Sequence, residues 1–204
     1  MIKKELIKAF PTPILITKYE NDLSKEIKFI EKQKLQSNGD NGNFRSKNTY
    51  LFNNKKLNKI KKFCEDSVDI FSKEIYFLQE NLKITQSWCN VNPKGSIHHA
   101  HTHSNSIISG VFYLRLNKDN PPIVFNNEFG WGIAPKLIKY SIFNSGQLIV
   151  PLKAGELILF PSSLNHSVSI NKSKTVRLSL SFNTFSKLLG NEDKLTEMDI
   201  TQLK

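Results

Sequence analysis

Hydrophobic residues recur at two different periods along the chain, and the change of period divides it into two parts. Up to about residue 82, apolar residues return every three or four positions, which is the spacing of one buried face of an α-helix. From Lys83 onward they occur in short runs that alternate with polar residues, as in β-strands with one buried face. The sequence therefore predicts helices first and strands afterwards, the segregated order of an α+β fold.

Two helices are expected in the first part. Asn21 and Asp22 are suited to cap the first helix, which ends near the polar stretch 37–43. Its apolar face consists of Leu23, Ile27 and Ile30. The second helix is longer, and its stripe consists of Leu57, Ile60, Cys64, Val68, Phe71 and Ile75. A stripe of this length must be buried against another surface, and a homodimer formed through this helix is one arrangement that we consider.

Six strands are expected in the second part, separated by turns rich in glycine and proline. They span Ile84–Val91, Ser106–Leu116, Ile123–Asn126, Gln147–Val150, Glu156–Pro161 and Thr175–Asn183. Several short strands with this spacing are typical of a sandwich, a jelly roll or a barrel. The final residues, Gly190 to Lys204, are polar and are expected to form a short helix or a frayed tail.

Length and composition bound the protein class. The chain has 204 residues, 39% hydrophobic and 23% charged, which fits one globular domain and excludes a disordered chain or a membrane bundle. We find no stretch long enough to span a membrane, and the first twenty residues lack the apolar core of a signal peptide. Two cysteines do not form a disulfide framework, so we expect a cytoplasmic protein.

The charge is strongly positive but does not indicate nucleic-acid binding. Lys plus Arg number 29 against 18 Asp plus Glu, giving a net charge of +11. The lysines are spread over helices and loops, and the chain has three arginines, Arg45, Arg115 and Arg177, although arginine is the residue that nucleic-acid recognition favours. A solvated lysine-rich surface is the better interpretation, and on this background each arginine becomes informative.

Histidines give the strongest chemical signal in the sequence. Four of the five lie between His98 and His103, and the fifth is His166. In an extended strand His101 and His103 point to the same side, at the spacing that two ligands of one metal require; His99 shares their parity, and His98 has the opposite one. A third ligand has to come from His166. The alternatives are a first pair made of His99 and His101, or an incidental histidine-rich surface turn.

Four segments resemble, in order, an iron(II)/2-oxoglutarate-dependent oxygenase family found in bacteria and phages. They are Trp88–Asn92, His101–His103 together with Ser109–Leu114, Leu159–His166 and Arg177–Asn183. The resemblance implies a double-stranded β-helix, the jelly roll of the cupin superfamily, packed on the helices. It divides the chain into a helical part at 1–82, a jelly-roll core at 83–186 and a polar tail at 187–204.

The resemblance also implies the cofactors and their binding residues. His101, His103 and His166 are expected to hold Fe(II), and no catalytic residue is expected beyond this metal centre. Along the last strand Arg177, Ser179 and Ser181 share one face, while Leu178, Leu180 and Phe182 share the other. Arg177 and Ser179 are therefore expected to bind the far carboxylate of 2-oxoglutarate, with Asn92 and Tyr113 as further contacts. Trp131 is a candidate for the wall of the substrate site.

His103 is a departure from the usual pattern of the superfamily, in which the second ligand is Asp or Glu. Three neutral imidazoles leave the iron one unit more positive than the usual site. The resemblance implies an iron(II)- and 2-oxoglutarate-dependent oxygenase that uses O2 to hydroxylate an unidentified small-molecule or peptide substrate and decarboxylates 2-oxoglutarate to succinate. Two alternatives remain: a three-histidine cupin-type dioxygenase or isomerase that does not use 2-oxoglutarate, and a non-enzymatic jelly-roll module that binds metal.

Overall fold

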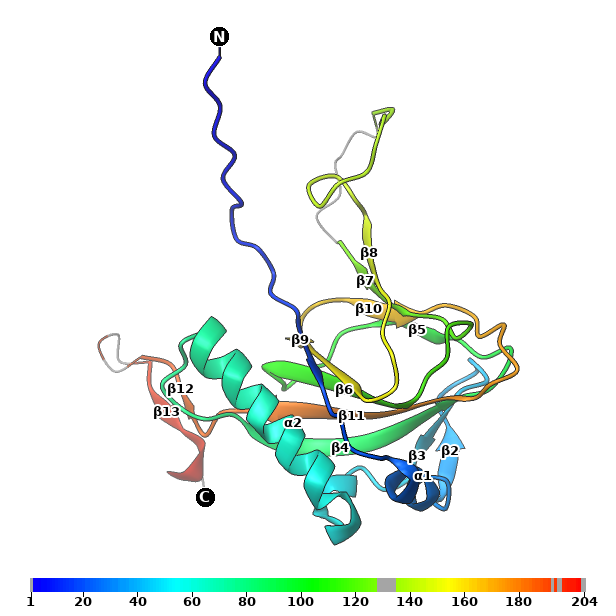
Figure 1. The fold of residues 1–204 in the computed structure, drawn as a ribbon. Coiled ribbons are helices and arrows are strands. Elements are labelled where there is room, and N and C mark those ends of the chain that lie inside the picture. Colours follow the sequence, from blue (N-terminus) through cyan, green and yellow to red (C-terminus); the bar gives the residue numbers. More distant parts are fainter. Residues whose placement is uncertain (1, 128–134, 192, 194–195, 203–204) are drawn as a thin grey trace.

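The computed structural model describes residues 2–127, 135–191, 193 and 196–202, and its main elements are two antiparallel sheets with helices on one side (Figure 1). The larger sheet has seven strands. In spatial order they are β1 (Leu15–Lys18), β9 (Glu156–Pro161), β6 (Ile108–Arg115), β11 (Arg177–Phe185), β4 (Lys83–Asn92), β3 (Phe44–Ser46) and β2 (Leu35–Ser37). Facing it is a four-stranded sheet of β5 (His98–His101), β10 (His166–Val168), β7 (Ile123–Asn126) and β8 (Gln147–Val150). The predicted fold class, a jelly roll packed on helices, is confirmed.

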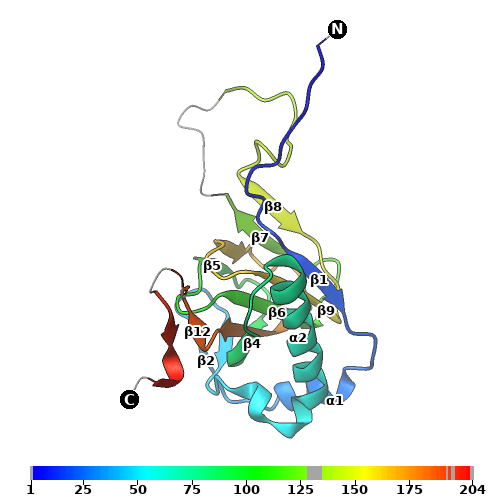
Figure 2. The ribbon, with the colours of Figure 1, turned by 90° about the vertical axis from the view of Figure 1, so that its left-hand side faces the viewer.

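The helices cover the outer face of the larger sheet (Figures 1 and 2). Helix α1 spans Ser24–Ile30, and α2 spans Asn58–Ile70 and continues through a π-helical turn, Phe71–Ile75. Short 3-10 turns at Leu51–Asn53 and Lys55–Leu57 precede α2, and another at Ile200–Gln202 follows a small hairpin of β12 (Leu188–Leu189) and β13 (Met198–Asp199). Most of the predicted stripe, from Leu57 to Phe71, packs into the core of the same chain, whereas Ile75 at its end is 36% exposed. Burial of this face within the fold leaves less of it for a second copy, and a homodimer through α2 stays a prediction.

Alternation along the strands separates the two faces of the larger sheet. Leu178, Leu180 and Phe182 of β11 pack with α2 on the outer face, whereas Arg177 and Ser179 point to the inner face. Near β6 and β9 the inner face is apolar and packs against β7. Near β11 and β4 it is polar and lines a pocket between the two sheets. The arrangement leaves one end of the jelly roll filled and the other open to a ligand.

All six predicted strands are present, with ends that differ by at most two residues. The predicted end of the first helix is wrong. Helix α1 stops at Ile30, and the following residues form the β2–β3 hairpin, which pairs with β4. Each of its strands has three residues, too few to show a period of two, and the pairing with β4 is what fixes them as strands.

Strand β1 was also not predicted, and it forms the edge of the larger sheet by pairing with β9. Among the described residues no helix is long and apolar enough to cross a bilayer. Trp131 lies outside the described residues.

Candidate metal centre and cofactor pocket

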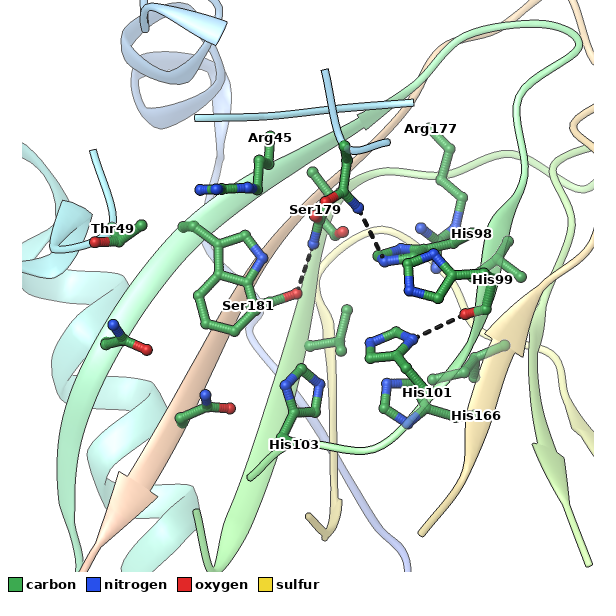
Figure 3. A pocket seen from close by; sticks show the side chains of 18 residues that line it. Arg45, Thr49, His98, His99, His101, His103, His166, Arg177, Ser179 and Ser181 are labelled. Carbon is green, nitrogen blue, oxygen red and sulfur yellow. Dashed lines mark hydrogen bonds between the residues drawn. The ribbon is translucent and has the colours of Figure 1, made fainter. Parts of the chain in front are cut away.

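Three histidines converge at one side of the pocket (Figure 3). His101 ends β5, His103 follows two residues later, and His166 begins β10 directly opposite His101. One ring nitrogen from each can be chosen so that all three lie within 4.8 Å of one another. The ring centroids are 4.4 Å apart for His101 and His166, 5.0 Å for His101 and His103, and 5.2 Å for His103 and His166. We call these three residues the histidine triad.

The backbone fixes the tautomer of two triad rings. Nδ1 of His101 lies 2.8 Å from the carbonyl oxygen of His99, and Nδ1 of His166 lies 3.0 Å from that of Leu164. A carbonyl oxygen accepts only, so in both rings Nδ1 carries the proton and donates it. Nε2 is then left with a free lone pair, as in most histidines that bind a metal through Nε2.

Burial keeps the triad neutral. Burial, together with repulsion between one imidazolium and the next, lowers the pKa of His166 to about 3 and that of His103 to about 4. Burial also lowers the pKa of His101. Neutral imidazole is the form that binds a metal ion, so the triad has the protonation state that a divalent cation needs at neutral pH.

His98 and His99 lie beside the triad but make other contacts. On β10, His166 and Val168 are two positions apart, whereas their partners on β5, His101 and His98, are three apart. This β-bulge changes the side of β5 that His98 faces. The prediction that His98 points away from His101 is therefore wrong, and the two rings stack with their centroids 4.8 Å apart. His99 is exposed, and its Nδ1 lies 3.0 Å from Nδ2 of Asn41. The geometry therefore favours the triad over a pair of His99 and His101.

Arg177 lies in the same pocket and is 2% exposed. Its Nη1 donates to Oδ1 of Asn92 at 3.4 Å and its Nη2 to the hydroxyl of Tyr113 at 3.1 Å, and the guanidinium lies 4.9 Å from the centre of the Tyr113 ring. Both partners are neutral. No carboxylate of the described residues forms an ion pair with this guanidinium. A buried cation without a counter-charge is costly, so the site requires an anion.

Several buried polar atoms around Arg177 also have no partner. They include Nε of Arg177, Oγ of Ser179 and Nδ2 of Asn92, and all three can donate a hydrogen bond. Buried donors are normally paired, and a cluster of unpaired ones beside an uncompensated cation matches the acceptors of a carboxylate. Together with the triad, this arrangement fits a dicarboxylate that reaches from a metal ion to Arg177.

The pocket has a volume of about 410 Å³, and most of the residues that line it have polar side chains. Its inner wall consists of alternate residues of β4 and β11, namely Gln86, Trp88 and Asn90, and Arg177, Ser179, Ser181 and Asn183. Asn38, Arg45 and Thr49 line it from the segment between β2 and β4. The sequence had singled out the β11 face and the histidines. It had not placed Arg45 or Asn38 here, because nothing before the fold shows that the β2–β3 hairpin joins β4.

Residues 86–183 match a family model with the description "Putative 2OG-Fe(II) oxygenase". This matched segment lies in the jelly-roll core and is similar to the 2OG-Fe(II) oxygenase family. The matched segment contains the histidine triad and Arg177. The two cofactors that the resemblance implied, iron(II) and 2-oxoglutarate, are those for which the family is named. No curated protein sequence matches the chain.

Several solved structures have a similar fold. HygX from Streptomyces hygroscopicus, crystallised with nickel, 2-oxoglutarate and hygromycin B, has a TM-score of 0.62 at 12% identity over 86% of this chain and 83% of its own. The non-heme α-ketoglutarate-dependent epimerase SnoN from nogalamycin biosynthesis has a TM-score of 0.63 at 11% identity, over 87% of this chain and 77% of its own. A Pseudomonas putida prolyl-4-hydroxylase has a TM-score of 0.58 at 15% identity, over 84% of this chain and 92% of its own. At these identities the similarity concerns the fold.

Proposed function

We propose that this protein is an iron(II)- and 2-oxoglutarate-dependent oxygenase that hydroxylates a small-molecule or peptide substrate. The observation that carries the proposal is the placement of a neutral histidine triad and an uncompensated, 2% exposed arginine in one pocket. His101, His103 and His166 would hold the iron. Arg177, Ser179, Asn92 and Tyr113 would bind the far carboxylate of 2-oxoglutarate.

The residues of the pocket have separate roles. The backbone carbonyls of residues 99 and 164 orient the ring nitrogens of His101 and His166 toward the ion. Arg177 and the donors beside it fix one end of the cosubstrate. When both cofactors are bound, the chemistry that they supply is activation of O2, with decarboxylation of 2-oxoglutarate to succinate and transfer of one oxygen atom to a C–H bond of the substrate.

Two features favour this function over the alternatives. A structural zinc site is normally closed by four protein ligands, whereas the described residues provide a group of three, as in metal sites that keep positions for other ligands. A cupin-type dioxygenase without 2-oxoglutarate would leave the substrate to supply the anion for Arg177. The family match of the jelly-roll core supports 2-oxoglutarate as that anion.

The test is an anaerobic titration with a matched pair of variants. Iron(II) and then 2-oxoglutarate are added, and the visible charge-transfer band of the chelate is recorded; O2 is then admitted and succinate is measured. The wild type should give the band and succinate. His103→Ala should give neither, whereas His99→Ala, which removes an exposed histidine outside the triad, should give both. Iron binding without a band would support the cupin alternative, and tight zinc with no response to 2-oxoglutarate would support a structural site.

A further inference from the structure

The pocket contains more positive charge than the proposed cofactors can neutralise. Two of the three arginines of the chain, Arg45 and Arg177, line it, and among the described residues no Asp or Glu does. The third arginine, Arg115, lies elsewhere and forms an ion pair with Glu31. Because the rest of the basic surplus is lysine that does not line the pocket, the placement of Arg45 there is not a consequence of overall composition.

Sheet register places Arg45 on the inner face of the larger sheet. Arg45 of β3 lies opposite Asn90 of β4, which lies opposite Ser179 of β11, so the three residues form one row across adjacent strands. Directly opposite residues share a face, which turns Arg45 toward the pocket (Figure 3). Trp88 is two residues from Asn90 on the same face. It is therefore a diagonal neighbour of Arg45, within reach of a long side chain.

The partner of Arg45 in this structure is neutral. With the amide of Gln36 oriented so that its oxygen faces the guanidinium, that oxygen accepts from Nη2 at 2.6 Å and from Nη1 at 2.9 Å. No carboxylate of the described residues forms an ion pair with Arg45. The side chain is half-buried, which weakens screening by water. A planar, partly desolvated guanidinium of this kind suits a carboxylate or a phosphoryl group.

The proposed cosubstrate cannot be that anion. One carboxylate of 2-oxoglutarate is needed at the metal, and the other at Arg177 on β11. Arg45 is on the second strand from β11, with β4 between them. The imidazoles of the triad are neutral ligands, so they remove none of the charge of the metal ion. The two negative charges of 2-oxoglutarate therefore face a divalent ion and two guanidiniums, and positive charge remains in excess.

We propose that the primary substrate carries an anionic group, a carboxylate or a phosphoryl group, which Arg45 binds while the face of Trp88 packs against the adjoining part of the substrate. This inference rests on the proposed function, because it takes the Arg177 site to be filled by 2-oxoglutarate. It assigns Arg45 to substrate specificity. Neutral analogues of the substrate, such as an amide in place of the acid, should bind more weakly.

The test uses the indole N–H of Trp88 as a reporter in two-dimensional NMR. The chain has two tryptophans, so Trp88→Phe identifies the signal. The protein is loaded with zinc(II), which is diamagnetic, and saturated with 2-oxoglutarate. Inorganic phosphate is then titrated in one series and acetate in another. The wild type should show a saturable shift, and the anion that binds more tightly identifies the group as phosphoryl or carboxylate.

The variants decide whether Arg45 is responsible. Arg45→Gln should weaken the response about tenfold, because one charge-assisted interaction is lost, and Arg45→Lys should retain part of it. Arg115→Gln removes the same charge outside the pocket and should leave the response unchanged. No shift in the wild type, or equal affinities in the wild type and Arg45→Gln, would overturn the inference. Binding of 2-oxoglutarate is measured in the same samples. If 2-oxoglutarate does not bind, the proposed function is contradicted, and this result is distinct from a missing response to phosphate or acetate.

Discussion

Replacing Arg177 by methionine should affect ligand binding and stability in different ways. The guanidinium is 2% exposed, donates to two neutral partners, and has no carboxylate partner among the described residues. If its role is to bind 2-oxoglutarate, removing it should weaken that binding strongly. If it were instead one half of a structural ion pair, its removal should mainly unfold the protein. Arg177→Met separates the two roles.

The expected magnitudes follow from the contacts. Losing a buried charge-assisted pair with the cosubstrate carboxylate should cost about 3 kcal/mol, or roughly 150-fold in Kd. In the cofactor-free protein the substitution removes the desolvation penalty of an uncompensated cation, several kcal/mol, but leaves Asn92 and Tyr113 without a partner at about 1–3 kcal/mol each. These effects oppose each other, so the free energy of unfolding should change by no more than about 1 kcal/mol, against about 3–5 kcal/mol for a broken buried ion pair.

Two assays on the same variant measure these quantities. The Kd of 2-oxoglutarate comes from the charge-transfer band of the iron-loaded protein, and the free energy of unfolding comes from urea denaturation of the metal-free protein. Arg115→Met, which removes a partly exposed arginine paired with Glu31, is the control and should leave the Kd unchanged. The reasoning is refuted if Arg177→Met binds 2-oxoglutarate within a few-fold of the wild type, or if it loses as much stability as a broken buried ion pair.

Three further results are expected. Gly110→Ala should lower the free energy of unfolding by more than about 2 kcal/mol in urea denaturation, because a Cβ there would lie 2.2 Å from Cζ of Phe182, whereas Gly146→Ala, with nothing within 4 Å, should be nearly neutral; equal effects would contradict this packing. The pKa values of the triad are lowered in the folded protein, so the unfolded metal-free chain binds more protons than the folded one between about pH 4 and 6.5. The free energy of unfolding should therefore fall as the pH falls through this range. Calorimetry at pH 5.5 should detect proton uptake on unfolding, and proton release would contradict this. Cys64 is fully buried and burial raises its pKa, so a thiol reagent should modify it in urea and not in the native protein; rapid native labelling would show that the core opens.

The sequence predicted those strands in which polar and apolar residues alternate along the strand itself. On β11 the alternation of Arg177 and Ser179 with Leu178 and Leu180 holds over the whole strand, so its two faces could be assigned before the fold was known. The grouping of the three histidines was predictable for a different reason. With five histidines in the chain and four of them clustered, a histidine that joins the cluster from another element had to be His166.

Features that depend on contacts between distant segments could not be predicted from the local sequence. The bulge in β5 arises from its pairing with β10, and it turns His98 toward the pocket against the parity of an undistorted strand. Arg45 is in the pocket because a three-residue strand pairs with β4. In both cases the side chain's environment is set by a neighbouring strand, and the local sequence contains no sign of it.

The most direct test of the central claim is a crystal structure of the protein grown without oxygen in manganese(II) and 2-oxoglutarate, with anomalous scattering used to locate the metal. The claim predicts one manganese peak bonded to ring nitrogens of His101, His103 and His166. It also predicts 2-oxoglutarate chelating that ion and ending on the guanidinium of Arg177. A metal peak on His98 or His99, or a cosubstrate carboxylate bound away from Arg177, would contradict it.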